Sequence, residues 1–206
     1  MREWEEKASW KNGALTGEGL CRKASGNKGV VICHPHPLMG GSMHNNVVEA
    51  VRDAFGDCGY STLRFNFRGV GQSTGRYDEG NGEKQDILSA CAFLKNSGVE
   101  DIALAGYSFG AWVCSRLLKD KPMPFALTVF ISPPQNYFEF DWTGLENAVD
   151  YMICGDSDDF VDVADLERRA AMLHAEFKIL KGTDHFFGGR ETQLTEKLKR
   201  FIEKKA

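Results

Sequence analysis

The feature that most constrains the fold is an alternation of short apolar runs with longer amphipathic segments. Residues 29–33 (GVVIC) have the length and the β-branching of a buried strand. Residues 42–58 follow with the pattern of a helix. Repeated strand–helix–strand units place parallel strands in one sheet and helices on its two faces. The chain is therefore predicted to form an α/β fold with a mostly parallel central sheet.

The remaining elements continue this alternation. Further strands are expected at residues 61–67, 101–105, 125–131, 149–154 and 176–180. Further helices are expected at residues 83–96, 109–119, 163–174 and 191–204. The N-terminal region differs, because two weaker strand patterns at 4–10 and 14–23 flank the turn sequence Lys11-Asn12-Gly13. They predict an antiparallel hairpin at one edge of the sheet.

Length and composition limit the classes of function. The 206 residues are 42% hydrophobic and 26% charged, and they predict a single α/β domain over residues 1–206. The net charge of −4 disfavours nucleic acid as a partner. No apolar run approaches the length of a membrane span, and residues 1–11 lack the apolar region of a signal peptide. We expect no membrane association, and no pattern indicates an oligomeric state.

The six cysteines do not form a recognisable metal or redox motif. They are Cys21, Cys33, Cys58, Cys91, Cys114 and Cys154, and no two are in Cys-x-x-Cys spacing. In apolar strands and helix faces, free cysteine behaves as a small hydrophobic residue. We expect reduced structural cysteines and a cytoplasmic location.

The sequence Gly106-Tyr107-Ser108-Phe109-Gly110 lies between a predicted strand and a predicted helix. A nucleophilic serine at such a turn has strained backbone, and its neighbours two positions away must be small to let strand and helix approach. The amide of Phe109 would be at the start of the helix, where it has no intrahelical acceptor and is available to bind an oxyanion. The alternative is a plain strand–helix turn.

Of the five histidines, His185 is the best candidate for a base. It follows the last predicted strand, and ligands of open parallel sheets bind at the carboxyl ends of the strands. It also comes after Ser108, with the acidic residues 155–161 between the two, which is the chain order serine, acid, histidine that accompanies a nucleophile at such a turn.

The loop 155–161 (GDSDDFV) follows another strand and supplies the candidate acids Asp156, Asp158 and Asp159. Asp158, three positions after the loop glycine, is our first choice to orient the histidine, and Asp156 is the second. Asp184 is set aside because adjacent residues do not normally face each other. We expect the others to be turn or helix-capping residues.

With these residues in place, the chain resembles the α/β-hydrolase superfamily over residues 28–189. More narrowly, it is similar to small bacterial hydrolases that have a His-Pro-His-Pro loop, lack a lid and are related to dienelactone hydrolases. The matching segments are residues 34–45 (HPHPLMGGSMHN), 66–73 (NFRGVGQS), 106–110 (GYSFG), Gly155 with Asp158, and 184–187 (DHFF). The resemblance implies a triad of Ser108, Asp158 and His185.

The loop after the first parallel strand departs from the pattern of the wider superfamily. It reads His34-Pro35 where a His-Gly pair is usual, and proline has no N–H to donate. The second oxyanion donor is therefore expected to be the amide of His36 or of Leu38. A metal site at His34 and His36 is the less favoured alternative, because no acidic or cysteine partner is near. We expect no metal and no cofactor.

The glycine-rich residues 66–75 lack the spacing of a dinucleotide-binding motif and are interpreted as a structural loop. Arg64 and Arg68 are expected in structural networks rather than at an anionic substrate.

The preferred hypothesis is a serine esterase that acts on a small-molecule acyl substrate. One alternative is the same triad acting as a peptidase or thioesterase, and another is a catalytically silent relative that binds a ligand or a partner. Between the strands at 125–131 and 149–154 the chain is too short for a lid domain. Its aromatic residues are expected either to line a pocket or to pack on the sheet.

Overall fold

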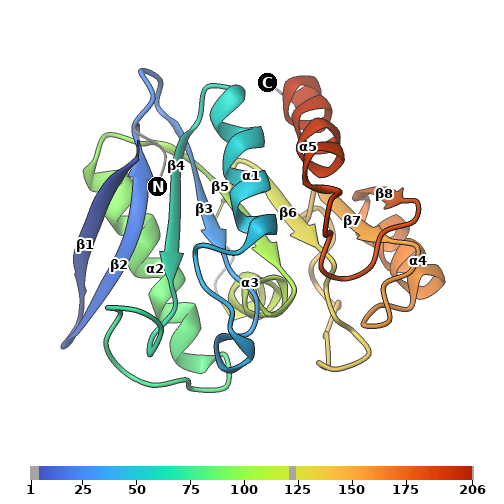
Figure 1. Cartoon of the computed structure of the whole chain (residues 1–206), viewed down its shortest axis with the longest axis horizontal. Helices are drawn as coiled ribbons and strands as arrows, with labels where there is room; N and C mark the ends of the chain where they lie inside the picture. Colours follow the sequence, from blue (N-terminus) through green and yellow to red (C-terminus); the bar gives the residue numbers. More distant parts are fainter. Residues whose placement is uncertain (1–4, 121–123, 206) are drawn as a thin grey trace.

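A computed structural model describes residues 5–120 and 124–205, which form a sheet covered by helices on both faces (Figure 1). The strands are β1 (Glu6–Asn12), β2 (Leu15–Arg22), β3 (Lys28–Cys33), β4 (Ser61–Asn66), β5 (Asp101–Tyr107), β6 (Thr128–Ile131), β7 (Tyr151–Gly155) and β8 (Glu176–Leu180). The helices are α1 (Asn46–Asp57), α2 (Asn81–Asn96), α3 (Phe109–Asp120), α4 (Val163–Leu173), α5 (Glu191–Lys205) and the short 3₁₀ helix η1 (Pro37–Met39).

Within the described residues, the strands form one eight-stranded sheet in the order β1-β2-β4-β3-β5-β6-β7-β8. The hairpin β1–β2 and the pair β2–β4 are antiparallel, and every other pair is parallel. The predicted α/β class and the antiparallel N-terminal hairpin are confirmed. The parallel strands β3 to β8 all end at the same edge of the sheet, where the predicted site residues follow them.

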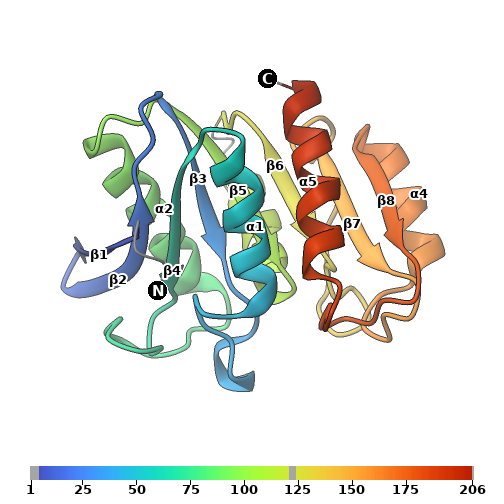
Figure 2. The same ribbon diagram turned by 45° about the horizontal axis from the view of Figure 1, so that its top comes forward.

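The central strands are buried on both faces, which explains their continuous apolar runs. In β3, Val30 and Ile32 face one hydrophobic cluster, while Val31 and Cys33 face the other. Helices α1 and α5 pack on the first face, and α2, α3 and α4 cover the second (Figure 2). The two layers hold the sheet, and therefore its carboxyl edge, in one fixed geometry.

Several predicted boundaries differ from the structure; the strand expected at 125–131, for example, begins only at Thr128. The hairpin turn is at Gly13 and the residue after it, because Asn12 pairs with Leu15 within the ladder. The helix expected from residue 42 begins at Asn46, and the side chain of Asn45 caps it by accepting the Val47 amide. The strand expected at 4–10 begins at Trp4, which lies outside the described residues.

The N-terminal hairpin is attached to the sheet by a buried ion network. The Arg64 guanidinium donates to both carboxylate oxygens of Glu5, at 2.9 and 2.7 Å, and also to Glu49. The Arg68 guanidinium donates from Nε to Asp86 Oδ2 at 3.0 Å and from Nη2 to Asp86 Oδ1 at 2.8 Å. Both arginines are thus part of structural networks, as predicted.

Between β6 and β7 the chain forms an irregular loop, residues 132–150, that contains no helix or strand. Its aromatic residues largely pack inward: Trp142 is buried, Phe140 stacks on it, and Phe138 contacts Trp112. Tyr137 is the exception and is exposed. In the part of the chain that the structure describes, no helix is long and apolar enough to cross a membrane.

Candidate active site

Ser108 lies at the tight turn where β5 ends and α3 begins. Its backbone is in the left-handed region, with a φ of 55°, which is strained for a residue other than glycine. A Cβ atom on Gly106 would lie 2.7 Å from the Ala111 backbone, and one on Gly110 would lie 2.4 Å from the Cys33 carbonyl oxygen. Both glycines are therefore required for the close approach of helix and strand.

The turn is held by backbone hydrogen bonds on both sides of Ser108. Its amide donates to the Ile131 carbonyl at 2.9 Å, which ties the turn to β6. Its carbonyl accepts from the amides of Ala111 and Trp112 in the first turn of α3. The strained conformation is thus maintained by the sheet and the helix together.

The Ser108 side chain meets His185, and His185 meets Asp158. The distance from Ser108 Oγ to His185 Nε2 is 3.0 Å. His185 Nδ1 lies 2.9 and 3.0 Å from the two carboxylate oxygens of Asp158. All three side chains are buried. The structure therefore brings the three predicted residues into one continuous chain of hydrogen bonds.

Two loops must approach closely to place Asp158 beside His185. Gly155 ends β7, and a Cβ atom there would lie 1.9 Å from the Thr183 carbonyl oxygen. The Ser157 amide donates to that same carbonyl at 3.0 Å. Any side chain at position 155 would push the two loops apart.

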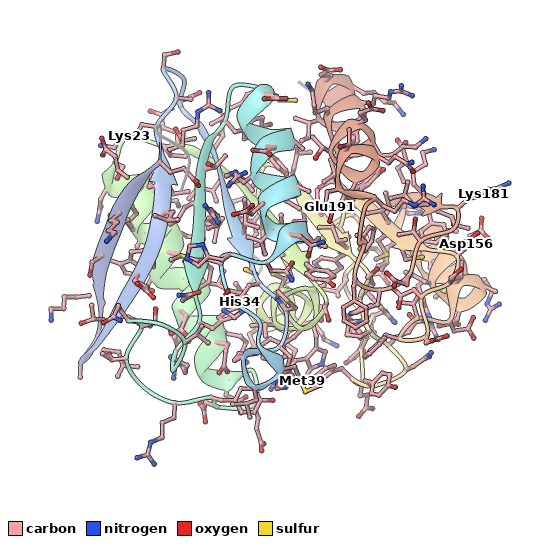
Figure 3. All side chains as sticks on the ribbon, viewed as in Figure 1. Lys23, His34, Met39, Asp156, Lys181 and Glu191 are labelled. Carbon is pink, nitrogen blue, oxygen red and sulfur yellow. The ribbon has the colours of Figure 1, made fainter. Side chains whose placement is uncertain are left out.

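The competing aspartates have other partners. Asp156 is exposed and accepts from the Thr183 amide at 3.3 Å. Figure 3 shows its side chain at the outer surface, on the same side of the molecule as Lys181. The Asp184 carboxylate accepts the amides of Phe186 and Phe187, so it shapes its own loop. The cap of α4 is Asp162, whose side chain accepts the Asp165 amide, so neither Asp156 nor Asp159 caps this helix.

The loop that presents His185 is anchored from several directions. The Tyr107 hydroxyl donates to the His185 carbonyl at 2.8 Å, and burial raises the pKa of that hydroxyl. Phe187 is fully buried with a φ of 57°, a strained conformation for a bulky residue. The role of Tyr107 had no signal in the sequence beyond its place next to Ser108.

Aromatic rings surround the His185 imidazole. Phe160 stacks on it, with ring centres 4.3 Å apart and an angle of 22° between planes. Phe186 contacts its edge at 5.6 Å and 90°. Tyr137 stacks in turn on Phe160 at 4.6 Å. Sequence reasoning missed these contacts, because they join three separate loops.

His34 follows β3 and is fully buried, with both ring nitrogens engaged by backbone. Its Nε2 accepts from the Phe67 amide at 3.0 Å, so Nδ1 carries the proton and donates to the Pro35 carbonyl at 2.6 Å. Burial lowers the pKa of His34 to about 4. With neither nitrogen available, His34 cannot act as a metal ligand in this conformation.

His36 lies between the loop after β3 and the first residue of α3. Its ring packs on Phe109 at 4.9 Å and on Tyr77 at 5.0 Å, and burial lowers its pKa. Its Nδ1 accepts from the Leu38 amide at 3.2 Å. Within the described part of the chain, the amides of His36 and Phe109 have no hydrogen-bond acceptor. Of the two predicted donors, Leu38 is thus already engaged and His36 is not.

The cysteines are all without disulfide partners, and none lies in a candidate metal cluster. Burial raises the pKa of Cys91 and of Cys154 to about 12, so these thiols stay protonated at neutral pH. Among residues 5–120 and 124–205, no group of three or more histidine, cysteine or acidic side chains is arranged to hold a metal ion.

Comparisons with known proteins agree with this architecture. The family model described as "Serine aminopeptidase, S33" matches residues 26–139. An uncharacterized protein of Rickettsia prowazekii (strain Madrid E) is 33% identical over 199 residues, covering 90% of this chain and 83% of the relative.

Two solved structures extend the similarity over nearly the whole chain. An α/β serine hydrolase homologue from Coxiella burnetii superimposes with a TM-score of 0.86 at 33% identity, covering 95% of this chain and 96% of that one. An α/β serine hydrolase without a lid, from Xanthomonas campestris, gives a TM-score of 0.86 at 26% identity, covering 99% and 96%. This chain therefore belongs to the serine aminopeptidase S33 family of hydrolases, with the α/β-hydrolase fold and no lid.

Proposed function

We propose that this chain is a serine hydrolase that cleaves esters of small acyl groups, with Ser108 as nucleophile, His185 as base and Asp158 as the acid that orients the imidazole. The observation that carries the proposal is the chain of contacts at 3.0 Å and 2.9 Å from Ser108 through His185 to Asp158, built on a strained turn. A nucleophile bonded to a base, which is itself oriented by a third group, is the arrangement that covalent catalysis requires.

In the first half of the reaction, Ser108 Oγ bonds to the carbonyl carbon of the ester while His185 Nε2 takes the serine proton. The bond from that carbon to the alcohol oxygen then breaks, and the proton passes from Nε2 to the departing oxygen. Water repeats the sequence on the acyl-enzyme, releasing the acid and restoring the serine. Asp158 stabilises the imidazolium that forms in both halves.

The negative oxygen of each tetrahedral intermediate needs two hydrogen-bond donors. The Phe109 amide is one candidate, because it opens α3 and has no acceptor among the described residues. For the second donor we favour His36 over Leu38, because the Leu38 amide already donates to the His36 ring. The His36 carbonyl is held in place, because it accepts from the amides of Met39, in η1, and of Gly41, two residues later, both at 3.0 Å.

The site lacks a domain to cover a long acyl chain, since the loop 132–150 packs largely on the core. Remote binding energy is then scarce on the acyl side. We expect p-nitrophenyl acetate and butyrate to turn over at least as well as the octanoate and palmitate esters. A strong preference for palmitate, or activation on micelles, would mean that this loop covers the serine during catalysis.

A fluorophosphonate probe tests the nucleophile directly. Intact mass should rise by one adduct that maps to Ser108, and Ser108→Ala should abolish labelling while the circular dichroism spectrum is unchanged. Labelling at Ser73 or Ser132 would overturn the assignment. A complete absence of labelling in the folded wild-type protein would favour a silent relative that binds a ligand or partner.

The family description, an aminopeptidase, favours a second candidate, in which the same three residues cleave a peptide bond. A panel of acyl esters, acyl thioesters and aminoacyl amides, assayed with wild type and Ser108→Ala, separates the candidates. The narrower relation to dienelactone hydrolases stays a prediction, and so does a cytoplasmic location, which the six unpaired thiols support.

A further inference from the structure

Two large aromatic side chains near His185 are exposed to solvent. Tyr137 is 66% exposed and Phe186 is 60% exposed. Phe160 joins them, with its ring centre 4.6 Å from that of Tyr137 and 6.1 Å from that of Phe186. We call Tyr137, Phe160 and Phe186 the aromatic shelf. It is continuous with the reacting centre, because Phe160 also stacks on the His185 imidazole.

The exposure of Phe186 is built into its loop. The Asp184 carboxylate accepts the Phe186 amide at 3.0 Å, and the Asn46 side chain donates to the Phe186 carbonyl at 2.9 Å. The next residue, Phe187, is buried in the core. The backbone is thus fixed in a conformation that directs one phenylalanine inward and leaves the other in water.

Tyr137 is positioned by bonds between two loops. The Asn136 amide donates to the Phe160 carbonyl at 3.2 Å, and the Asn136 side chain donates to the Asp159 carbonyl at 3.3 Å. These bonds fix the loop of Tyr137 against the loop of Phe160. An aromatic surface that is held in place before binding loses little conformational entropy when a ligand covers it.

The chemistry of the proposed reaction says which part of a substrate would lie there. The departing alcohol oxygen receives its proton from His185 Nε2, so the alcohol must leave on the His185 side of the scissile bond. The acyl group stays on Ser108. A surface that packs against the imidazole is therefore placed to contact the alcohol.

We propose that the aromatic shelf binds the alcohol part of the ester, and that the preferred alcohol is aromatic and uncharged. This inference rests on the proposed function of Ser108 and His185. Stacked and edge-to-face rings attract each other beyond the burial of their surface. Asp159 and Asp184 are exposed in the same two loops, so an anionic alcohol would be repelled.

The test varies the alcohol and the acyl group separately. Tyr137→Ala and Phe186→Ala should each lower kcat/KM for 2-naphthyl acetate about five- to tenfold and leave kcat/KM for ethyl acetate within about twofold of wild type. Comparing variant with wild type on each substrate removes the difference in intrinsic reactivity between the two esters. With p-nitrophenol fixed, the loss should be the same for acetate and butyrate.

The rate at which the acetyl-enzyme is hydrolysed distinguishes two roles of the aromatic shelf, binding of the alcohol and support of His185. The alcohol has already left at that stage, so neither variant should change this rate. Tyr137→Phe keeps the ring and should therefore retain the preference for 2-naphthyl acetate over ethyl acetate that Tyr137→Ala loses. Met172→Ala is the matched control, because Met172 is 61% exposed in the last turn of α4, just before β8 begins, and so lies at the edge of the sheet opposite the site.

Each other result overturns the shelf. Equal losses on both alcohols with slower deacylation would mean that the rings only support His185. Unchanged rates would mean that they contact no part of the substrate, and a loss that grows with acyl length would place them on the acyl side. If wild type cleaves no ester and Ser108 is not labelled, the proposed function itself fails and the shelf falls with it. If the wild type is active but shows no preference between aromatic and aliphatic alcohols, only the proposal for the aromatic shelf is wrong.

Discussion

Two histidines follow parallel strands at the same edge of the sheet, and both are buried, but their surroundings make them opposites. His34, after β3, has one ring nitrogen on a backbone amide and the other on a backbone carbonyl. His185, after β8, has one nitrogen on a carboxylate and the other on a serine hydroxyl. Location at the edge of the sheet does not distinguish them, whereas the chemistry of their partners does.

The difference shows what a buried imidazole needs in order to exchange protons. The backbone partners of His34 fix one neutral tautomer and offer no negative charge, so burial disfavours the imidazolium. Asp158 provides that charge for His185. We therefore interpret the first histidine as part of the framework and the second as part of the chemistry.

Replacing each histidine by alanine is the strongest test of this contrast. His185→Ala should lower kcat by about 10⁵-fold or more with a normal unfolding transition, as loss of a triad base does elsewhere. His34→Ala should instead lower the free energy of unfolding by about 2 kcal/mol, because it leaves the Phe67 amide without an acceptor. Ester turnover and urea unfolding, measured on both variants, check the pair. The contrast breaks if His34→Ala abolishes turnover while stability is unchanged.

The carboxylate partner is the next point at which the contrast can be tested. Asp158→Asn should lower kcat about 10⁴-fold, because an amide cannot hold His185 in the required tautomer or compensate its charge. Asp156→Asn, in the same loop but exposed, is the matched control and should have little effect. Initial rates on p-nitrophenyl acetate suffice. If Asp156→Asn is the more damaging change, the orienting acid has to be reassigned.

The contrast also predicts how stability responds to acid. Folding lowers the pKa of His34 from 6.5 to about 4, so in this pH range the unfolded chain binds a proton that the folded chain does not. Lowering the pH from 6.5 to 4 should therefore reduce the free energy of unfolding, by about 3 kcal/mol from this group alone. Urea unfolding at a series of pH values measures the slope. The slope should flatten in His34→Gln, which still offers an acceptor, and an unchanged slope would assign the effect to other groups.

The smallest expected effect concerns the hydrogen bond that positions His185. Tyr107→Phe removes the donor to the His185 carbonyl and keeps the ring. A lost hydrogen bond of about 1 kcal/mol corresponds to about a fivefold lower kcat, with KM unchanged. The rate of fluorophosphonate labelling should fall by the same factor. An unchanged kcat together with lower stability would restrict Tyr107 to a structural role.

Much of the fold follows from local patterns, and the exceptions have identifiable causes. The strands in the centre of the sheet are buried on both faces, so β3 and β5 were visible as apolar runs. The sequence predicts a start of α1 at residue 42, which is too early, because a long-range contact keeps residues 42–45 out of the helix. The Met43 amide donates to the Asn66 side chain at 2.8 Å, and no local pattern contains that bond.

The site follows the same division. The sequence pattern shows the order of Ser108, Asp158 and His185 and places each of them after a strand. The rule that ligands of open parallel sheets bind at the carboxyl ends of the strands then brings them to one site. The choice of Asp158 over Asp156 depends on its position three residues after Gly155, and only the close approach of Gly155 to Thr183 shows which carboxylate meets His185. The aromatic shelf could not be predicted, because it depends on bonds between the loops at 133–138 and 156–162.

Ser108 and Phe187 both hold left-handed backbone, and Ser132 at the end of β6 does so too, with a φ of 43°. Each such residue costs about 1–3 kcal/mol that the rest of the fold must offset. At Phe187, glycine would delete a fully buried ring that contributes more than the strain costs. Selection for heat resistance alone would therefore find Ser108 and Ser132 early, because glycine relieves the strain there at once. Lineages under that selection should drift toward glycine there and lose turnover as they gain melting temperature. A population selected for both properties should keep all three and improve elsewhere, on surfaces remote from the strand ends.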